Sequence, residues 1–301
     1  MKPDTFYRRL LGLLTLLLVI TFPSLAADNS GNVVQWYIAS FPPINITSGP
    51  NRGQGWGDRR LEAITRRLTG YQHEIVEASG IRMTEDMQRK PNICNTGLLK
   101  TPEREQYLIF SDPILWIIPN GAITTRVRYA TLKPYLNDRG ELKLAEYLQQ
   151  ANPRIGTHAS RKYGKGIDAT IQKYATANTL VAVPSGAYPA ARLLKLANQD
   201  EYDIVLGYPA ELRYLAREAA LKESNFVFLS IVEEPGLIQT YVACSKSDLG
   251  QKVIAQVNKI IGHPQVQDEL LVAYKHWLDD ETAARYDRLR QQTLSNRRPG
   301  N

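Results

Sequence analysis

Apolar residues recur along this chain with two different periods. Short apolar runs alternate with segments in which apolar side chains return every three or four residues, as in amphipathic helices. Strands are predicted at 33–38, 74–77, 92–94, 107–110, 122–127, 154–157, 180–183, 202–206, 226–231 and 237–244. Helices are predicted at 61–68, 84–88, from 101, 141–150, 162–174, 189–198, from 209, 249–261 and 266–279. This alternation predicts an α/β fold with mainly parallel sheets flanked by helices.

Two blocks of strands and helices are followed by a late return strand. Residues 233–236, Glu-Glu-Pro-Gly, mark a turn or crossover before that strand. A chain near this length begins to form two cores instead of one. We therefore predict two lobes joined by more than one crossing segment.

The N-terminus has the pattern of a secretory leader. Basic residues precede an apolar run over 10–22, and small residues follow at Ala26 and Ala27. A membrane anchor, the alternative, needs about 20 apolar residues, and Pro23 interrupts this run earlier. We expect residues 1–26 to be a cleaved signal peptide, with no lipid anchor because no cysteine lies near the cut.

The charged residues of the mature chain do not suggest a nucleic-acid surface. Removing 26 residues leaves 275 of the 301 and lowers the formal net charge from +7 to +5. Most basic residues stand beside acids on predicted helix faces, as in 58–62, Asp-Arg-Arg-Leu-Glu, and 211–214, Glu-Leu-Arg-Tyr. We interpret these as solvated faces. Residues 281–301 include a dense basic stretch and are predicted to form a helical or disordered tail.

Motifs for catalysis, metals or cofactors are missing from the sequence. The four histidines are scattered, without metal-binding spacing, and neither a nucleophile elbow nor a P-loop is present. Residues 53–57, Gly-Gln-Gly-Trp-Gly, lack dinucleotide-binding spacing. They fit either a flexible loop before a helix or a loop that lets Trp56 approach a ligand. We expect no metal, no cofactor and no catalytic residues.

Residues 92–114 resemble a motif of the family 3 extracellular solute-binding proteins, the periplasmic receptors of polar amino acid ABC transporters. That motif is a strand, a small polar loop, T-x-x-R at a helix start, and a strand ending F-S-x-P. Here Thr101 to Arg104 and Phe110 to Pro113 match it. Residues 41–44, 55–58 and 202–205 resemble the family's aromatic-proline loop, first-helix start and second-lobe strand, in the same order.

The resemblance implies a type II periplasmic-binding fold with two lobes. Lobe one would be residues 27–124 plus 237–280, and lobe two 125–236. Hinge strands would lie near 124–127 and 234–237. In such receptors the lobes close by a hinge motion around a ligand held between them.

The resemblance also implies ligand-binding positions in lobe one. Phe41 and Trp56 would be aromatic walls, and Thr96 and Gly97 would form the polar loop. Arg104 would pair bidentately with a ligand carboxylate, a role that suits a planar guanidinium. Its alternative is a surface ion pair with a neighbouring acid such as Glu103.

Lobe two departs from the family pattern. His158 and Ser160 lie in a loop before a helix, where amides and a hydroxyl favour anions, although His158 could equally be loop packing. Tyr208 follows Gly207 where an acid usually receives the ligand ammonium, and Leu99 replaces a frequent hydroxyl. A buried ammonium without a carboxylate is costly. An ordinary α-amino acid is therefore doubtful as ligand, unless another acid substitutes.

Cys94 and Cys244 are the only cysteines. Such a pair suggests a disulfide in an oxidising compartment and two thiols in the cytosol. The resemblance places both strands in the lobe-one sheet. We therefore predict a bond that closes a loop of 150 positions around lobe two.

The leading hypothesis is a monomeric periplasmic protein that binds a small, carboxylate-bearing, amino-acid-like solute for an ABC permease. A second is an enzyme on the same fold, such as a cyclohexadienyl dehydratase relative, with His158, Glu103 and Asp112 as the visible acid–base candidates. A third is an orphan sensor or accessory binding protein. Only the first requires a cognate permease.

Overall fold

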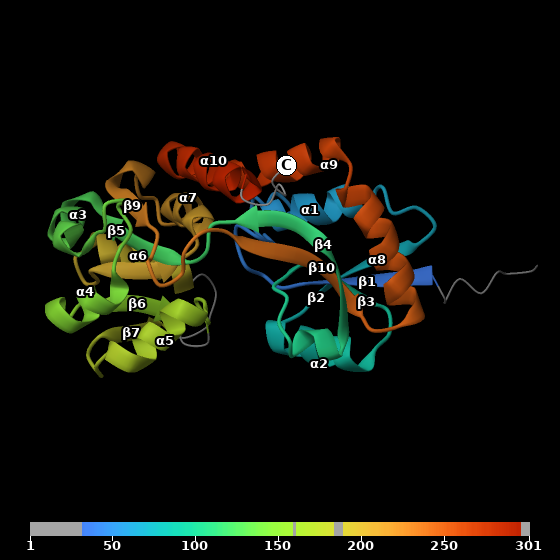
Figure 1. Cartoon of the computed structure of the whole chain (residues 1–301), viewed down its shortest axis with the longest axis horizontal. Coiled ribbons are helices and arrows are strands. Elements are labelled where there is room, and N and C mark those ends of the chain that lie inside the picture. Colours follow the sequence, from blue (N-terminus) through green and yellow to red (C-terminus); the bar gives the residue numbers. More distant parts are fainter. Residues whose placement is uncertain (1–31, 159–160, 184–188, 296–301) are drawn as a thin grey trace, which may run out of the picture. The chain divides into compact units, whose positions relative to one another are not determined.

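A computed structural model describes residues 32–158, 161–183 and 189–295. The predicted leader and Ser160 lie outside these residues. The strands are β1 (Val33–Ile38), β2 (Gln72–Glu77), β3 (Ile93–Leu98), β4 (Leu108–Ile117), β5 (Gly121–Thr125), β6 (Ile155–His158), β7 (Leu180–Val183), β8 (Ile204–Gly207), β9 (Phe226–Leu229) and β10 (Ile238–Ser245). Figure 1 shows them as two separate sheets with helices around each.

The α-helices follow the predicted order, with two additions, and the helix predicted from residue 101 is not among them. They are α1 (Trp56–Thr65), α2 (Gly80–Arg89), α3 (Arg126–Leu132), α4 (Leu144–Ala151), α5 (Lys165–Tyr174), α6 (Pro189–Asn198), α7 (Pro209–Glu218), α8 (Asp248–Ile261), α9 (Pro264–Lys275) and α10 (Asp280–Ser295). Within the described ranges, no helix combines the length and apolar character needed to cross a bilayer.

Both sheets are mixed, and each has one reversed strand. The first has the order β2-β1-β3-β10-β4, and the second β7-β6-β8-β5-β9. β10 is antiparallel to both its neighbours, β3 and β4. β5 is likewise antiparallel to β8 and β9. The other strands of each sheet run in one direction, so the prediction of mainly parallel sheets flanked by helices is confirmed.

The chain crosses between the sheets twice. β4 ends the first run in sheet one and β5 begins in sheet two, so residues 118–120 form the first crossing. Residues 230–237, between β9 and β10, form the second. The predicted boundary after residue 124 therefore falls inside a second-sheet strand. The predicted hinge strand at 124–127 is also wrong, because α3 begins at Arg126 with its N-terminus capped by the Thr125 hydroxyl.

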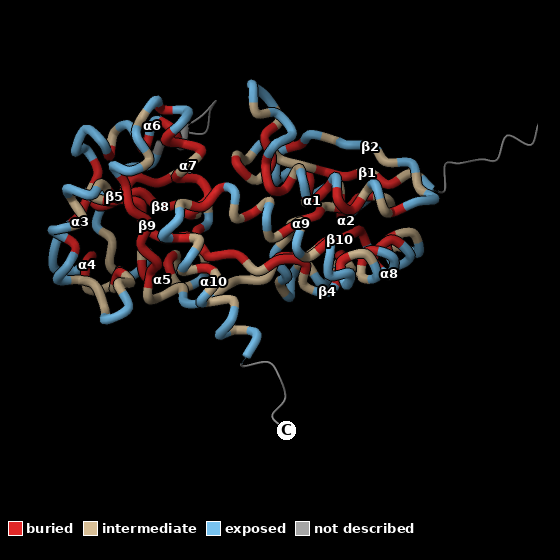
Figure 2. Tube along the Cα trace, turned by 90° about the horizontal axis from the view of Figure 1, so that it is seen from above, coloured by how far each residue is buried: buried red, intermediate tan, exposed pale blue. Residues whose placement is uncertain are grey.

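Successive side chains along the strands of the first sheet point to opposite faces and pack into different cores. Trp36 and Cys94 pack with α1 and α8 on one face, whereas Tyr37 and Ile93 pack with α2 on the other. In Figure 2 the buried segments run through the centre of each sheet and along the covered helix faces. The first of these cores continues through Tyr274 and the aromatic end of α9 into the α6–α7 face of the second sheet.

The segment predicted as a tail contains an ordered helix, α10. Tyr286 on this helix is fully buried, and its Oη donates to the carbonyl of Trp116 at 2.8 Å. Arg285 pairs with Glu141 at 2.8 Å, which connects the helix to the segment before α4. A buried aromatic side chain and an ion pair thus connect this largely polar helix to the rest of the protein.

The predicted disulfide is present. Cys94 in β3 lies directly opposite Cys244 in β10, and the two are bonded. The loop that the bond closes has a sequence separation of 150 and contains every strand of the second sheet.

Candidate functional site

Several predicted ligand residues meet at the carboxyl edge of the first sheet. β1 and β3 run parallel, so their carboxyl ends share one edge, the usual ligand side of an open α/β sheet. Phe41 lies in the loop after β1 and is half-buried, while Thr96 and Gly97 lie near the end of β3. Trp56, the first residue of α1, lies at the same edge. The Gly57 N–H donates to the Ile44 carbonyl and the Ile46 N–H donates to Asp58, so hydrogen bonds connect the start of α1 to residues 44–46.

Trp56 is packed into the lobe and not openly exposed. The residue is 4% exposed, and its ring lies edge-on to that of Tyr274, with 5.3 Å between ring centroids. Arg60 lies over the ring, with Cζ 4.8 Å from the centroid. The Trp56 face that points toward the β3 loop is therefore covered by an arginine from its own helix.

Arg104 is held by its own loop. Its Nη1 donates to the Leu99 carbonyl at 2.8 Å, and its backbone N–H donates to Thr101 Oγ1. Arg104 forms no ion pair with any described residue, and the helix predicted from Thr101 is only a 3-10 turn over Arg104–Gln106. The short turn leaves the guanidinium partly exposed.

The second sheet contributes a buried ion pair that sequence reasoning did not anticipate. Arg161, after β6, pairs with Glu211 of α7 through hydrogen bonds of 2.8 and 2.6 Å. Glu211 also accepts from the Tyr208 N–H at 2.7 Å and so closes the N-terminus of α7. Burial alone would lower the pKa of Arg161, but the charge and hydrogen bonds of Glu211 raise it.

The buried position of Glu211 changes two interpretations of the sequence. It was assigned to a solvated helix face, yet it is 2% exposed. An acid was also missing at the end of the second-lobe strand, and Glu211 supplies one in the first turn of the following helix. The sequence signal was Tyr-Pro-Ala-Glu at 208–211, in which proline and glutamate stand at their preferred helix-start positions.

The carboxyl edges of the two sheets meet at Arg161. Its Cζ lies 4.9 Å from the ring of Phe41 and 5.2 Å from that of Tyr208. Asn120, in the first crossing, accepts from Arg161 Nη2 at 2.6 Å and donates to the Tyr163 carbonyl at 2.9 Å. Residues of both lobes and of the crossing thus surround one guanidinium, which aromatic faces stabilise.

His158 ends β6 beside this group. Its backbone N–H donates to Tyr163 Oη at 2.8 Å. Burial, and then the positive charge of Arg161, lower the pKa of His158, while Glu211 opposes the shift. A cavity of about 680 Å³ opens here, lined by residues that include His158, Arg161, Lys162, Lys165 and Asp168. The lining carries more basic than acidic groups, which favours an anionic occupant.

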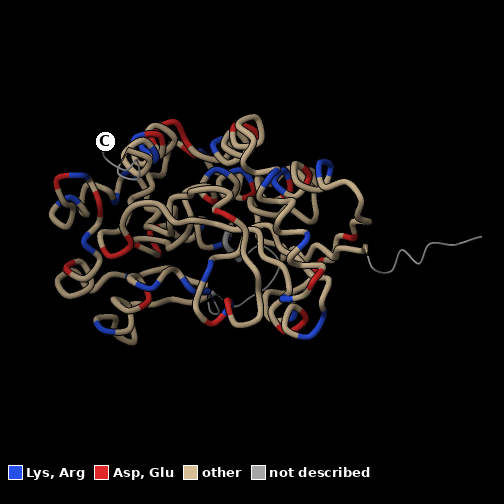
Figure 3. Tube along the Cα trace, turned by 45° about the vertical axis from the view of Figure 1, so that its right-hand side comes forward, with Lys and Arg blue, Asp and Glu red and all other residues tan. Residues whose placement is uncertain are grey.

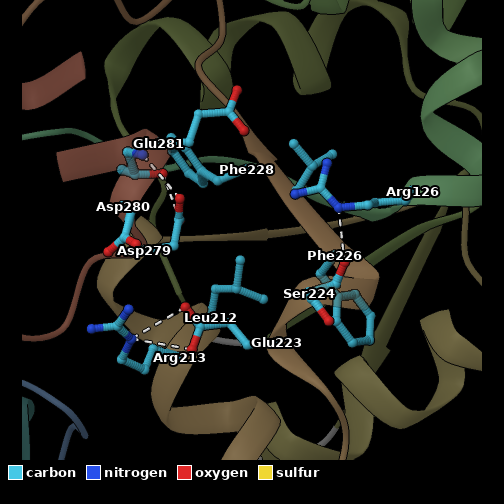
Figure 4. Close-up of a pocket in the computed structure, with 12 residues that line it drawn as sticks. Arg126, Leu212, Arg213, Glu223, Ser224, Phe226, Phe228, Asp279, Asp280 and Glu281 are labelled. Carbon is cyan, nitrogen blue, oxygen red and sulfur yellow. Dashed lines mark hydrogen bonds and ion pairs between the residues drawn. The ribbon is translucent and has the colours of Figure 1, made fainter. Parts of the chain in front are cut away.

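A separate pocket of about 440 Å³ lies between α7, β9 and the start of α10 (Figure 4). Its basic side chains already have partners: Arg213 points toward Glu223, and Arg126 reaches the carbonyl of Ser224. The pocket shares no residue with the site around Arg161. No cluster of three or more potential metal ligands occurs within the described parts of the chain.

Comparison with known proteins gives a clear result for the fold. No protein-family model matches the sequence, and a search of curated proteins finds no significant match. Among solved structures, the VFT2 domain of Bordetella pertussis BvgS aligns at TM-score 0.55 and 16% identity, over 84% of this chain and 95% of that one. A putative L-cystine ABC transporter protein from Listeria monocytogenes aligns at TM-score 0.58 and 13% identity, over 83% and 97%.

A third structure is a histidine kinase sensor domain described as similar to periplasmic binding proteins. It aligns at TM-score 0.57 and 15% identity, over 82% of this chain and 96% of that one. These alignments cover nearly the full length of each known structure, whereas the identities are too low to carry over residue roles. The chain therefore has the two-sheet fold of the type II periplasmic binding proteins, at 13–16% sequence identity to these three structures.

Proposed function

We propose that this protein binds a small, carboxylate-bearing solute between its two lobes, in the periplasm. The observation that carries this proposal is the meeting of Phe41 from the first sheet with Arg161 from the second, at 4.9 Å. This contact brings both lobes to one site. Because Glu211 already pairs with Arg161, the basic groups suited to a small anion there are Lys162 and Lys165, which line the adjacent cavity and form no ion pair with a described residue. The fold, shared with solute-binding proteins, supports the same role.

The charges around the site favour an anion over an ordinary α-amino acid. A ligand ammonium needs a carboxylate in a closed site. Glu211, the buried acid at the second-sheet edge, is already neutralised by Arg161. We propose that the solute resembles an amino acid in size and carries one or more carboxylates, with Thr96, Gly97, Arg104, His158, Ser160 and Tyr208 near it.

We propose delivery to an ABC permease by a monomeric receptor. The predicted leader supports a periplasmic location, and the similar structures include the substrate-binding protein of an amino acid ABC transporter. A sensor or accessory role is the second candidate, because a histidine kinase sensor domain is among the similar structures. Genes for a permease and an ATPase beside this gene would favour transport, and a kinase gene would favour sensing.

We propose binding without catalysis. Glu103 and Asp112, two of the acid–base candidates, are both exposed. We therefore expect each solute to be recovered unchanged after incubation with the protein. Product formation without stoichiometric binding would favour the enzyme hypothesis.

A thermal-shift screen of the mature chain tests the proposed function. The compounds are dicarboxylates, keto acids, amino acids, amines and small peptides. A solute at a hundred times its Kd adds about 2.7 kcal/mol, a rise in Tm on the order of 5–10 °C for a chain of this size. We expect carboxylates to give this rise and amines to give none.

Two variants make the screen specific. Phe41→Ala should weaken binding by up to about tenfold, the upper end of the energy of a lost aromatic contact. Val127→Ala changes an exposed side chain on α3 and is the matched control. The absence of a shift with every compound, or equal affinity of Phe41→Ala and Val127→Ala, would contradict the proposal. Arg104→Ala in the same assay tests the clamp implied by the family resemblance.

A further inference from the structure

Arg60 is a buried cation without a hydrogen-bond acceptor. It lies in α1 and is 2% exposed. Its Nε and Nη1 are buried and have no partner among the described residues, and the same holds for Nε1 of the adjacent Trp56. Arg60 forms no ion pair with any described residue, whereas its neighbour Arg59 pairs with Glu62 at 3.1 Å on the exposed face.

The guanidinium is held in place from two sides. Trp56, four residues earlier on the same helix face, stacks against it at 4.8 Å. On the other side, a Cβ added at Gly97 would lie 1.9 Å from Arg60 Nη2. The group therefore occupies space that only a glycine leaves open. This position is at the end of β3, on the carboxyl edge of the first sheet.

The buried positive charge of Arg60 lacks a counter-ion among the described residues. An unpaired charge in the protein interior is strongly unfavourable unless a counter-ion or hydrogen bonds satisfy it. Asp58 is the nearby acid, but it accepts from Asn45 Nδ2 and from the N–H groups of Ile46 and Gly55. Burial lowers the pKa of Arg60 to about 9, opposed by the charge of Asp58, so the group is still charged at neutral pH.

We propose that Arg60 and Trp56 Nε1 form an oxyanion subsite that receives a carboxylate of the bound solute, beside Gly97. A guanidinium and an indole N–H are donors without acceptor capacity, so an oxyanion is the partner they fit. The identification of the oxyanion as part of the solute rests on the proposed function. The subsite itself rests on the unpaired donors.

The direct test is ¹⁵N NMR of the arginine Nε–H groups in the mature chain, titrated to tens of millimolar with succinate, acetate and inorganic phosphate. The Arg60 signal is assigned by its loss in Arg60→Met. We expect it to move with succinate and acetate, and to remain in place with a neutral diamide of succinate. Movement with phosphate alone identifies a free inorganic anion as the occupant and contradicts a carboxylate site. No movement with any anion overturns the subsite.

Matched variants supply a second readout. Arg60→Met removes the unpaired charge, so we expect the ligand-free protein to have a higher Tm than Arg59→Gln, the control on the exposed face. Solute affinity should fall about 10- to 100-fold in Arg60→Met, the loss expected for charge-assisted hydrogen bonds, and should be unchanged in Arg59→Gln. Gly97→Ala should also lower solute affinity, because its Cβ would lie 1.9 Å from Arg60 Nη2 and displace the guanidinium from the subsite.

The outcomes separate the two proposals. If a solute is found and Arg60→Met binds it as tightly as Arg59→Gln, the subsite is wrong and the proposed function stands. If succinate moves the Arg60 signal but no compound gives a thermal shift, the subsite stands and the proposed function fails.

Discussion

The surroundings of His158 disfavour its charged form, because the side chain is partly buried and lies near the cation Arg161. Both lower its pKa in the folded protein, burial more than Arg161. The unfolded chain therefore takes up the proton first as pH falls. The contribution of His158 to the free energy of unfolding is fully present above the unfolded pKa of about 6.5. It is lost progressively as pH falls from there toward the lower pKa of the folded state.

We expect the urea-unfolding free energy of the wild type to fall between pH 7 and pH 5 more steeply than that of His158→Gln, which keeps a polar side chain without the titration. Carboxylates elsewhere contribute equally to both proteins, so the difference between the two curves isolates His158. Parallel curves over this range would contradict the assignment.

The residues that sequence reasoning misplaced are charged ones on buried helix faces. Arg60 was assigned to a solvated face because acids flank it, yet it lies four residues from both Trp56 and Ile64 and shares their buried stripe. Helical spacing alone could have identified that position. What the sequence could not show is that Gly97, from a distant strand, leaves space for the guanidinium.

At the scale of elements, the apolar periodicity predicts the bounds of strands and helices well where they are buried on one side. β1, β7 and α6 have the predicted bounds. The sequence predicts residues 281–301 as a helical or disordered tail, and α10 is helical. Its bounds could not be predicted because tertiary contacts such as those of Tyr286 and Arg285 hold it, and not a regular apolar stripe. The helix expected at Thr101 is a single 3-10 turn, since β4 begins at Leu108 and leaves no room for more.

The disulfide between β3 and β10 should contribute strongly to stability. For a loop of 150 residues, the chain-entropy model gives about 5 kcal/mol. We expect the Cys94→Ala, Cys244→Ala double variant to unfold at a Tm lower by on the order of 10 °C. Reduction of the wild type should give the same loss. Intact mass without reductant provides the control, and two free thiols in the wild type would contradict the bond.

At the scale of the whole molecule, charge is dispersed and the core is shared. Figure 3 shows basic and acidic residues interspersed over the described chain. One core cluster includes Trp36 of the first sheet, Trp277 after α9 and Phe228 of the second sheet. Tyr214 of α7 contacts Trp277 with 5.7 Å between ring centroids. The lobes are therefore joined by aromatic packing as well as by the two crossing segments.

We expect this shared core to make unfolding a single cooperative transition. Differential scanning calorimetry of residues 27–301 should show one peak, with equal calorimetric and van't Hoff enthalpies. Trp277→Ala removes one aromatic link between the lobes, the contact with Tyr214, and should lower Tm and broaden the peak or split it. Two resolved peaks in the wild type would mean that the lobes unfold independently.

The Cys94–Cys244 bond also determines what a protease can release. Because the bond joins the two sides of the segment that holds the whole second sheet, a single cleavage anywhere between these cysteines opens a ring and frees no fragment. The two pieces remain covalently joined until the bond is reduced. The protein, cut once in its second lobe, would thus stay one molecule under oxidising conditions, with both sheets still tethered for refolding.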